Sequence, residues 1–285
     1  MRFARLGEPG AEVPVVIVDG VALDISGITP TIDGDFLESG GVERVRARLG
    51  ELTPLDGAGG LRVGSPIARP SAVICIGQNY AAHARESGSE PPAHPIVFLK
   101  TPNTVVGPDD DVRIPRGSVK TDWEVELGVV IGTRASYLDS PDDSRAHIAG
   151  YVTANDVSER DFQMGVSGGQ WSKGKSAPTF SPVGPWLVTP DEVDASSLRL
   201  RSWVNGEPRQ DSSTADQIFS VDHLIWDLSQ YLALEPGDLI LTGTPEGVAF
   251  GGKFPYLTEG DVVEIEIEGL GHQRQRLVGW SGASE

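Results

Sequence analysis

Two glutamates separated by one residue, Glu124 and Glu126, stand at the start of an otherwise apolar segment, residues 123–131. If this segment is a strand, its side chains alternate between faces, so both carboxylates point to the same side. Two ionised carboxylates that share a buried face repel each other and lose hydration unless a cation lies between them. Oxygen ligands suit a hard divalent ion such as Mg2+, Mn2+ or Ca2+. The pair therefore predicts a divalent-cation site that needs a third ligand.

Alternating glutamates are also typical of a solvent-facing strand, and this alternative stays open. The same alternation recurs at Glu264, Glu266 and Glu268, where no polar motif lies nearby and the segment ends in a Gly-Leu-Gly sequence. Glu124 and Glu126 differ because their strand continues into a fully apolar run. The first pair is therefore expected in the interior.

A dense polar segment supplies the candidate third ligand. Residues 153–163 follow a strand-like run and combine carboxylate, guanidinium and amide groups, among them Asp156. Asn155 or Asp156 can also cap a helix, with Glu159 placed for a capping box. Capping and ligation are compatible, so both interpretations are kept.

Short strands and tight turns dominate the elements that would position these residues. Asp-Gly at 19–20 and Asn-Gly at 205–206 predict hairpins. A helix is predicted over residues 221–234 with Ser220 as its N-cap, and residues 37–49 are helix-like. Strands do not alternate regularly with helices, which argues against a doubly wound parallel sheet. The predicted fold class is mixed β (α+β), with a few helices covering the sheets.

A glycine-rich tract marks a candidate domain boundary. Residues 56–60 (Asp-Gly-Ala-Gly-Gly) show no apolar periodicity, and Pro66 and Pro70 follow. We therefore predict a small β-rich N-terminal domain, residues 1–68, and a larger domain, residues 69–285.

Charge and composition exclude several classes of partner. The 285 residues carry a formal net charge of -18, which repels phosphate backbones and anionic lipid, so neither nucleic acid nor a membrane is an expected partner. No apolar run reaches the roughly 20 residues of a membrane span. The single cysteine, Cys75, lies in an apolar run and is expected to be a buried thiol. A cytoplasmic protein is the expectation.

Five motifs agree in order and spacing with one known family, and together they cover most of residues 70–279. They are GQNYAAHARE (77–86), FLKTP (98–102), DWEVELG (122–128), NDVSERDFQ (155–163) and LTGTPEGV (241–248). The sequence resembles the fumarylacetoacetate hydrolase family, and in particular the bacterial subgroup that includes 2,4-diketo-3-deoxy sugar-acid hydrolases and 2-hydroxyhepta-2,4-diene-1,7-dioate isomerases. The resemblance implies the β-sandwich roll of that family.

The resemblance also implies a metal site. The family's ligands correspond here to Glu124, Glu126 and Asp156, and the implied cofactor is Mg2+ or Mn2+, with Ca2+ as a further option. A His-Glu pair that activates water corresponds to His83 and Glu86, which are three residues apart and so are neighbours on a helical face. A casual surface pair is the alternative interpretation of these two residues.

Four further residues match substrate-handling positions of the family. Lys175 matches the lysine that stabilises negative charge on the substrate, and Lys173 is expected to be a solvated charge. Arg160 and Gln163 match substrate contacts. Thr244 matches a threonine near the substrate carboxylate, although a plain tight turn explains its motif equally well.

The implied activity is metal-dependent hydrolysis of a C–C bond in a 2,4-dioxo acid, either an acylpyruvate or a 2,4-diketo-3-deoxy sugar acid. Family members that share these ligands also isomerise 2-hydroxyhepta-2,4-diene-1,7-dioate or decarboxylate 2-oxo acids, and the motifs do not separate the three activities. A non-enzymatic, metal-stabilised protein that binds an organic acid is the alternative of another class. The implied partners are a small 2-oxo acid and a second copy of the chain in a homodimer.

Overall fold

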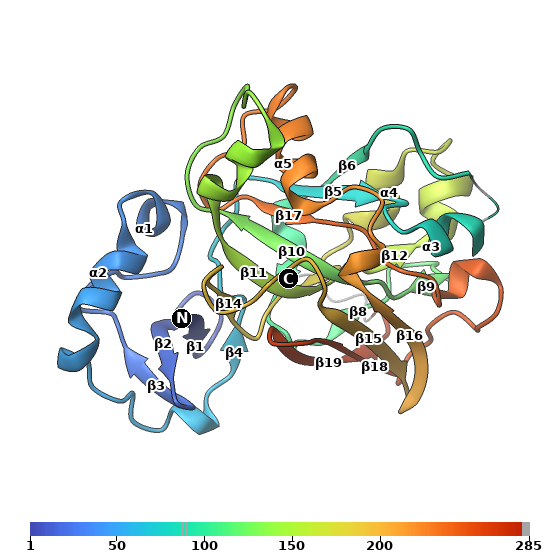
Figure 1. The fold of residues 1–285 in the computed structure, drawn as a ribbon. Helices are drawn as coiled ribbons and strands as arrows, with labels where there is room; N and C mark the ends of the chain where they lie inside the picture. Colours follow the sequence, from blue (N-terminus) through green and yellow to red (C-terminus); the bar gives the residue numbers. More distant parts are fainter. Residues whose placement is uncertain (87, 89, 281–285) are drawn as a thin grey trace.

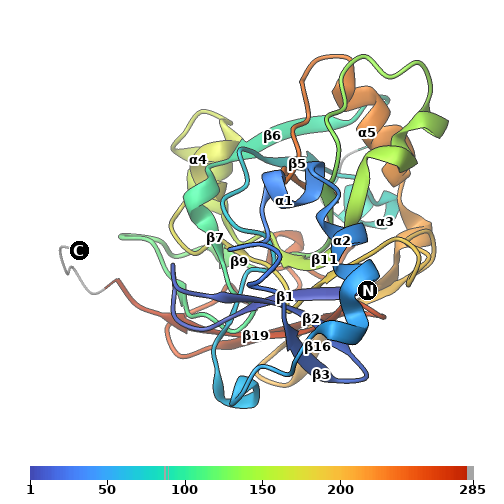
Figure 2. The ribbon, with the colours of Figure 1, turned by 90° about the vertical axis from the view of Figure 1, so that its left-hand side faces the viewer.

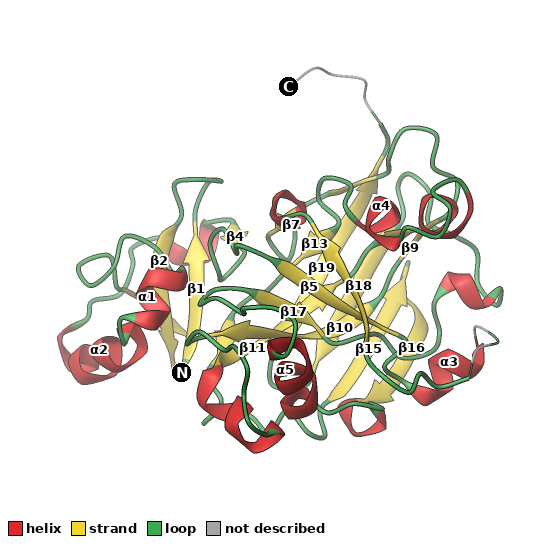
Figure 3. Cartoon of the chain, turned by 90° about the horizontal axis from the view of Figure 1, so that it is seen from above, coloured by secondary structure: helices red, strands yellow, loops and turns green. Residues whose placement is uncertain are grey.

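Two β-sheets with a few peripheral helices form the body of the protein. The computed structural model describes residues 1–86, 88 and 90–280. Figure 3 shows the strands in the interior and the helices around them. This arrangement confirms the mixed α+β fold class.

The larger sheet runs from the N-terminal strands to the strands that carry the site (Figure 1). Its path is β3 (Val21–Asp24), β2 (Val13–Val18), β1 (Arg2–Leu6), β14 (Leu187–Val188), β11 (Ile148–Asn155), β10 (Val125–Ile131), β17 (Leu239–Leu241), β5 (Val73–Gly77) and β6 (Ile96–Lys100), and β4 (Val63–Gly64) pairs with β1.

The second sheet packs against the middle of the first. Its order is β16 (Glu207–Ser213), β15 (Arg199–Val204), β18 (Val262–Ile267), β19 (Gly271–Val278) and β8 (Val112–Arg113). All seven residues of β10 are buried, because β10 has a strand on each side and contacts β15 and β18 of the other sheet. Two short pairs complete the strands: β9 (Thr121–Asp122) with β12 (Ser158–Glu159), and β7 (Val105–Val106) with β13 (Ser181–Pro182).

Both predicted hairpins are confirmed. The turn between β2 and β3 has Asp19 at φ 50° and Gly20 at φ 80°, and the turn between β15 and β16 has Asn205 at φ 53° and Gly206 at φ 79°. Two consecutive positive φ angles match the twist of the flanking strands, and Asp-Gly and Asn-Gly tolerate them.

The helices are α1 (Gly34–Glu38), α2 (Gly41–Arg48), α3 (Ala81–Glu86), α4 (Trp171–Lys175) and α5 (Val221–Ser229), with a π-helical turn η5 (Asp161–Gly165) and a 3-10 turn η7 (Ala249–Gly251) near the site. The predicted N-cap of α5 is confirmed, since the Ser220 side chain accepts from the backbone N–H of His223.

Two helix predictions were wrong in their bounds. α5 ends at Ser229 and not at residue 234, because the following segment turns so that Leu234 exchanges two backbone hydrogen bonds with Ala135. The helix-like stretch 37–49 is divided between α1 and α2, because Gly40 is left-handed with φ 72°. None of the described helices is long and apolar enough to cross a membrane.

The N-terminal strands are continuous with the rest of the fold. β1 pairs with β14, so residues 1–24 extend the larger sheet. Phe3 and Val16 belong to the same buried cluster as Val73 and Cys75. Figure 2 views this side of the molecule, with α1, α2 and β1 to β3 facing the reader. The buried thiol predicted for Cys75 is confirmed, and the division of the chain near residue 69 stays a prediction.

Candidate active site

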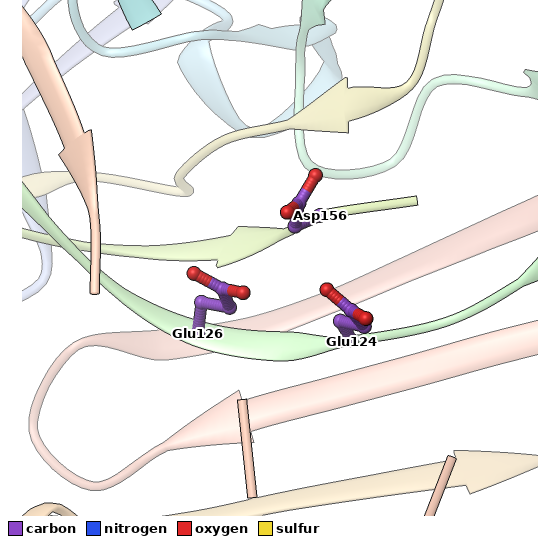
Figure 4. Close-up of side chains that lie close together, drawn as sticks. All are labelled: Glu124, Glu126 and Asp156. Carbon is purple, nitrogen blue, oxygen red and sulfur yellow. The ribbon is translucent and has the colours of Figure 1, made fainter. Parts of the chain in front are cut away.

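Three carboxylates converge where β10 and β11 meet. Glu124 precedes β10, Glu126 lies on it, and Asp156 follows β11. The antiparallel register pairs Val125 with Asn155, so residues about 30 positions apart in the chain become neighbours. Figure 4 shows the three side chains pointing toward one another. One carboxylate oxygen from each residue lies within 4.8 Å of the other two, and all three residues are buried.

Three cations neutralise part of this charge. The Lys175 Nζ lies 2.6 Å from Glu124 Oε2 and 2.8 Å from Asp156 Oδ2. Lys100 Nζ lies 2.5 Å from Asp156 Oδ1, and Arg160 Nη2 lies 2.6 Å from Glu124 Oε1. Burial would raise the pKa of Glu124, but the positive charges of Lys175 and Arg160 outweigh it and hold that pKa well below its usual range.

Glu126 differs from its neighbour because it lacks a cationic partner among the ion pairs of residues 1–86, 88 and 90–280. Its Oε2 accepts a hydrogen bond from the Gly243 N–H at 2.8 Å. Burial, followed by the negative charges of Asp156 and Glu124, raises the pKa of Glu126 well above its usual range. A positive charge beside Glu126 would therefore stabilise its ionised carboxylate.

The donor set fits a hard divalent cation. It offers carboxylate oxygens from Glu124, Glu126 and Asp156, which is the ligand chemistry that Mg2+, Mn2+ and Ca2+ prefer. The Lys175 ammonium already lies on two of the three carboxylates, which shows that a positive charge is stabilised here. The other alternating set faces outward on β18, where Glu264 is 3.5 Å from His272 and Glu266 is 3.1 Å from Arg201.

His83 and Glu86 lie on α3, directly after β5. The His83 Nδ1 is 3.4 Å from Glu86 Oε2. The two Glu86 oxygens also accept from the backbone N–H of Gly247 at 3.2 and 3.1 Å. Glu86 therefore links α3 to the loop after β17, and it orients the imidazole ring.

One cavity of about 130 Å3 brings most of the predicted residues together. Two larger cavities, of about 850 and 800 Å3, are lined by none of the three carboxylates. Asp156 contacts Lys175 behind the wall of the small cavity, and Glu86 contacts His83. The small cavity is lined by Ile76, Gly77, Gln78, His83, Phe98, Glu124, Glu126, Arg160, Gln163, Met164, Trp171, Lys175, Thr244 and Phe250.

The predicted substrate contacts are held firmly by the protein. Arg160 donates to Asp122, Glu124 and Gln163. The Thr244 hydroxyl donates to the Val125 carbonyl at 2.9 Å and accepts from the Gln210 amide at 2.8 Å. Lys173 is exposed, as the sequence predicted, and Lys175 is buried.

Three residues that hold the site were absent from the sequence prediction. Lys100 and Asp122 lie inside the FLKTP and DWEVELG motifs, and both are buried charged residues. Asp122 is fully buried and accepts hydrogen bonds from Arg160 and from the N–H groups of Ala249 and Phe250. Gln210 belongs to a polar strand of the second sheet, and nothing in that segment predicts its contact with Thr244.

Comparisons with known proteins identify the family of the chain. Residues 72–278 match the family described as fumarylacetoacetate (FAA) hydrolase C-terminal. A 2,4-didehydro-3-deoxy-L-rhamnonate hydrolase from Sphingomonas sp. (strain SKA58) is 44% identical and aligns over 98% of this chain and 97% of that protein.

Two solved structures have the same fold. One is a 5-carboxymethyl-2-hydroxymuconate delta-isomerase from Mycobacterium smegmatis, with a TM-score of 0.78 and 35% identity over 99% of this chain and 100% of that chain. The other is a maleylpyruvate hydrolase from Sphingobium sp. SYK-6 in complex with manganese(II) and pyruvate, with a TM-score of 0.79 and 27% identity over 98% of this chain and 99% of that chain.

Proposed function

Because the chain belongs to the fumarylacetoacetate hydrolase family, we propose that it is a divalent-metal-dependent hydrolase that cleaves a C–C bond in a 2,4-dioxo acid. The products are pyruvate or a related 2-oxo acid and a carboxylic acid. The observation that carries this proposal is the convergence of three buried carboxylates beside the cavity that His83 and Lys175 line.

In this proposal Glu124, Glu126 and Asp156 hold Mg2+ or Mn2+. When bound, such an ion polarises the oxygen atoms of a 2-oxo acid as a Lewis acid. The manganese and pyruvate in the Sphingobium relative support both the ion and the product class.

His83 is the proposed general base. A neutral imidazole whose ring is oriented by a carboxylate can take a proton from water. Glu86 contacts the Nδ1 atom of His83, and the His83 side chain lines the cavity. The contact of Glu86 with Gly247 keeps this pair in register with the loop that carries Thr244.

The proposed reaction balances as a hydrolysis. The water oxygen forms a bond to C4 as His83 takes its proton, and the C3–C4 bond then breaks. C4 leaves as a carboxylic acid, and the electron pair passes to C3 as the enolate of the C2 carbonyl. The proton that His83 took from water then passes to C3 and gives the 2-oxo acid. The Lys175 ammonium stabilises the negative charge as it develops, while Arg160, Gln163 and Thr244 bind and orient the acid.

Isomerisation is the second candidate, because the Mycobacterium smegmatis relative with the same fold is named as an isomerase. An isomerase needs the same carboxylates and a proton carrier, but no attack by water. The two activities therefore differ in their products and share the residues of the site.

Turnover on a small panel tests the proposal. The substrates are acetylpyruvate, fumarylpyruvate, a 2,4-dioxo-3-deoxy sugar acid, oxaloacetate and 2-hydroxyhepta-2,4-dienedioate, each with Mg2+ or Mn2+ and with EDTA. We expect metal-dependent release of a 2-oxo acid and a carboxylic acid from a diketo substrate. A product of unchanged mass would indicate an isomerase, and CO2 release would indicate a decarboxylase. No turnover of any substrate, together with tight metal binding, would favour a binding protein.

A further inference from the structure

We propose that the substrate carries a single carboxylate and an uncharged distal end. This inference rests on the proposed function and narrows its substrate class. It follows from the charges around the small cavity, all of whose cations are already paired within the protein.

The positively charged side chains that line the cavity already form ion pairs with buried carboxylates. Lys175 pairs with Glu124 at 2.6 Å and with Asp156 at 2.8 Å. Arg160 pairs with Asp122 and Glu124, and its guanidinium lies 5.1 Å from the centre of the Phe250 ring, which covers one face of it. A distal carboxylate would have to compete for Lys175 and Arg160 with these buried acids, which belong to the site whether or not a ligand is bound.

The net formal charge of the metal-bound site would neutralise one substrate carboxylate and no more. Ion pairs and the carboxylate cluster link three buried cations, Lys100, Arg160 and Lys175, to four buried carboxylates, Asp122, Glu124, Glu126 and Asp156. One negative charge is left, and a bound divalent ion would convert it to one positive charge. That charge matches the carboxylate of a 2-oxo acid and leaves nothing for a second one. The nearby His83 faces Glu86, which adds a further negative charge at that side.

The remaining wall suits an uncharged group. Five apolar side chains line it: Ile76, Phe98, Met164, Trp171 and Phe250. The uncharged polar lining groups are amides and a hydroxyl, from Gln78, Gln163 and Thr244. A carboxylate buried against such a wall loses hydration without gaining a counter-ion. The volume of about 130 Å3 also favours a short distal chain.

Two acylpyruvates of equal length test the inference by turnover. Butanoylpyruvate and succinylpyruvate have the same seven-carbon chain and differ by a methyl group against a carboxylate at the distal end. With Mn2+, we expect kcat/KM to be at least about 100-fold higher for butanoylpyruvate, since a buried, unpaired charge is strongly disfavoured. Equal values, or a preference for succinylpyruvate, would overturn the inference while leaving the hydrolase proposal intact.

A variant at the cavity rim supplies the matched control. Met164 lines the cavity and is half exposed, so a longer cationic side chain can be accommodated there. Met164→Lys should shift the preference toward succinylpyruvate by at least about tenfold, whereas Met164→Gln, of similar size and neutral, should not. Equal shifts in both variants would mean that shape and not charge sets the preference.

Binding of non-hydrolysable acids keeps the two proposals separable. Calorimetry on the Mn2+-loaded protein compares 2-oxopentanoate with 2-oxoglutarate, which have the same chain length and one or two carboxylates. Tighter binding of 2-oxopentanoate supports the inference even if no diketo acid is cleaved, in which case only the hydrolase proposal fails. Equal or tighter binding of 2-oxoglutarate would refute it.

Discussion

Lys175 occupies oxygens that a divalent cation also needs. Its ammonium lies between Glu124 and Asp156, so a bound ion and the lysine compete for the same negative charge. We predict that Lys175→Met lowers kcat by about 10²- to 10³-fold, as expected for loss of one group that stabilises developing charge. The same variant should bind Mn2+ at least as tightly as the wild type, because a competing positive charge is gone.

Calorimetry with Mn2+ and steady-state kinetics separate these two effects. The control is Lys173→Met, two residues away and exposed, which should change neither quantity. Loss of Mn2+ binding in Lys175→Met would indicate that the lysine is needed to form the metal site, contrary to the competition described above.

His83 has a different relation to the metal, since it lines the cavity without belonging to the carboxylate cluster. We predict that His83→Ala lowers kcat by about 10²- to 10⁴-fold, the usual contribution of a general base, with little change in Mn2+ affinity. His272→Ala, on the exposed face of β19, is the control. Turnover that survives in His83→Ala would remove this residue from the role of base.

Glu126 gives the site a pH dependence. Its pKa in the metal-free protein is raised by burial and by Asp156 and Glu124, so the folded protein holds a proton that an ordinary glutamate has lost. A ligand must be ionised, so metal binding releases this proton, and Mn2+ affinity should fall as the pH falls below the raised pKa. The stability of the metal-free protein should fall as the pH rises from the unfolded-state pKa toward the raised one.

Calorimetry at several pH values, in buffers with different ionisation enthalpies, measures the released proton directly. Thermal unfolding with EDTA and with Mn2+ follows the stability, and Mn2+ should remove most of its decline with pH. An Mn2+ affinity independent of pH, with no proton release, would contradict the protonated state of Glu126.

At the residue scale, the sequence separates the two glutamate sets by their context. Glu124 and Glu126 precede an apolar run and are buried, while Glu264 and Glu266 alternate with buried residues of β18 and lie beside His272 and Arg201. The partners that fix the charges were not predictable in this way. Lys100 reaches Asp156 from another strand, and a distance between side chains on separate strands leaves no local pattern.

At the element scale, the site depends on how closely α4 approaches the turn η5. A Cβ at Gly174 would lie 2.4 Å from the Gln163 backbone nitrogen and 2.5 Å from the Glu159 carbonyl oxygen. Only a glycine allows this approach, which places the next residue, Lys175, on the carboxylates.

We predict that Gly174→Ala displaces α4, lowers the unfolding free energy by about 1–3 kcal/mol and lowers kcat by about 10²-fold. Chemical denaturation and steady-state kinetics measure the two losses. Gly165→Ala is the matched control, because nothing lies within 4 Å of a Cβ at that position. Full activity in Gly174→Ala would show that the position of α4 is not critical.

Secondary-structure elements are predicted well where residues close together in the sequence determine them. The Asp-Gly and Asn-Gly turns were predicted because their φ angles favour those residues, and the Ser220 cap because its side chain bonds within its own turn. The end of α5 was missed because Leu234 pairs with Ala135, nearly one hundred residues away in the chain. The end of a helix cannot be predicted from a local pattern when it depends on a residue far away in the sequence.

At the scale of the whole molecule, residues 1–68 are joined to the rest by both hydrogen bonds and apolar packing. β1 continues the larger sheet through β14. Phe3, which is fully buried, packs edge-to-face on Phe36 with ring centres 5.8 Å apart, in a cluster that also contains Val73 and Cys75. The glycine-rich tract predicts a boundary in the chain, but a boundary in the chain does not require independent folding.

We therefore predict that a chain beginning at residue 69 is folded poorly or aggregates, because β14 loses one of its two partner strands and the apolar side chains under β1 become exposed. Circular dichroism and size-exclusion chromatography test this directly. Phe3→Ala is the milder variant and should lower the unfolding free energy by about 3–5 kcal/mol, while Leu61→Ala, which is exposed, should have little effect. A cooperative melting transition in the shortened chain, at the temperature of the full chain, would instead establish residues 69–285 as an independent domain.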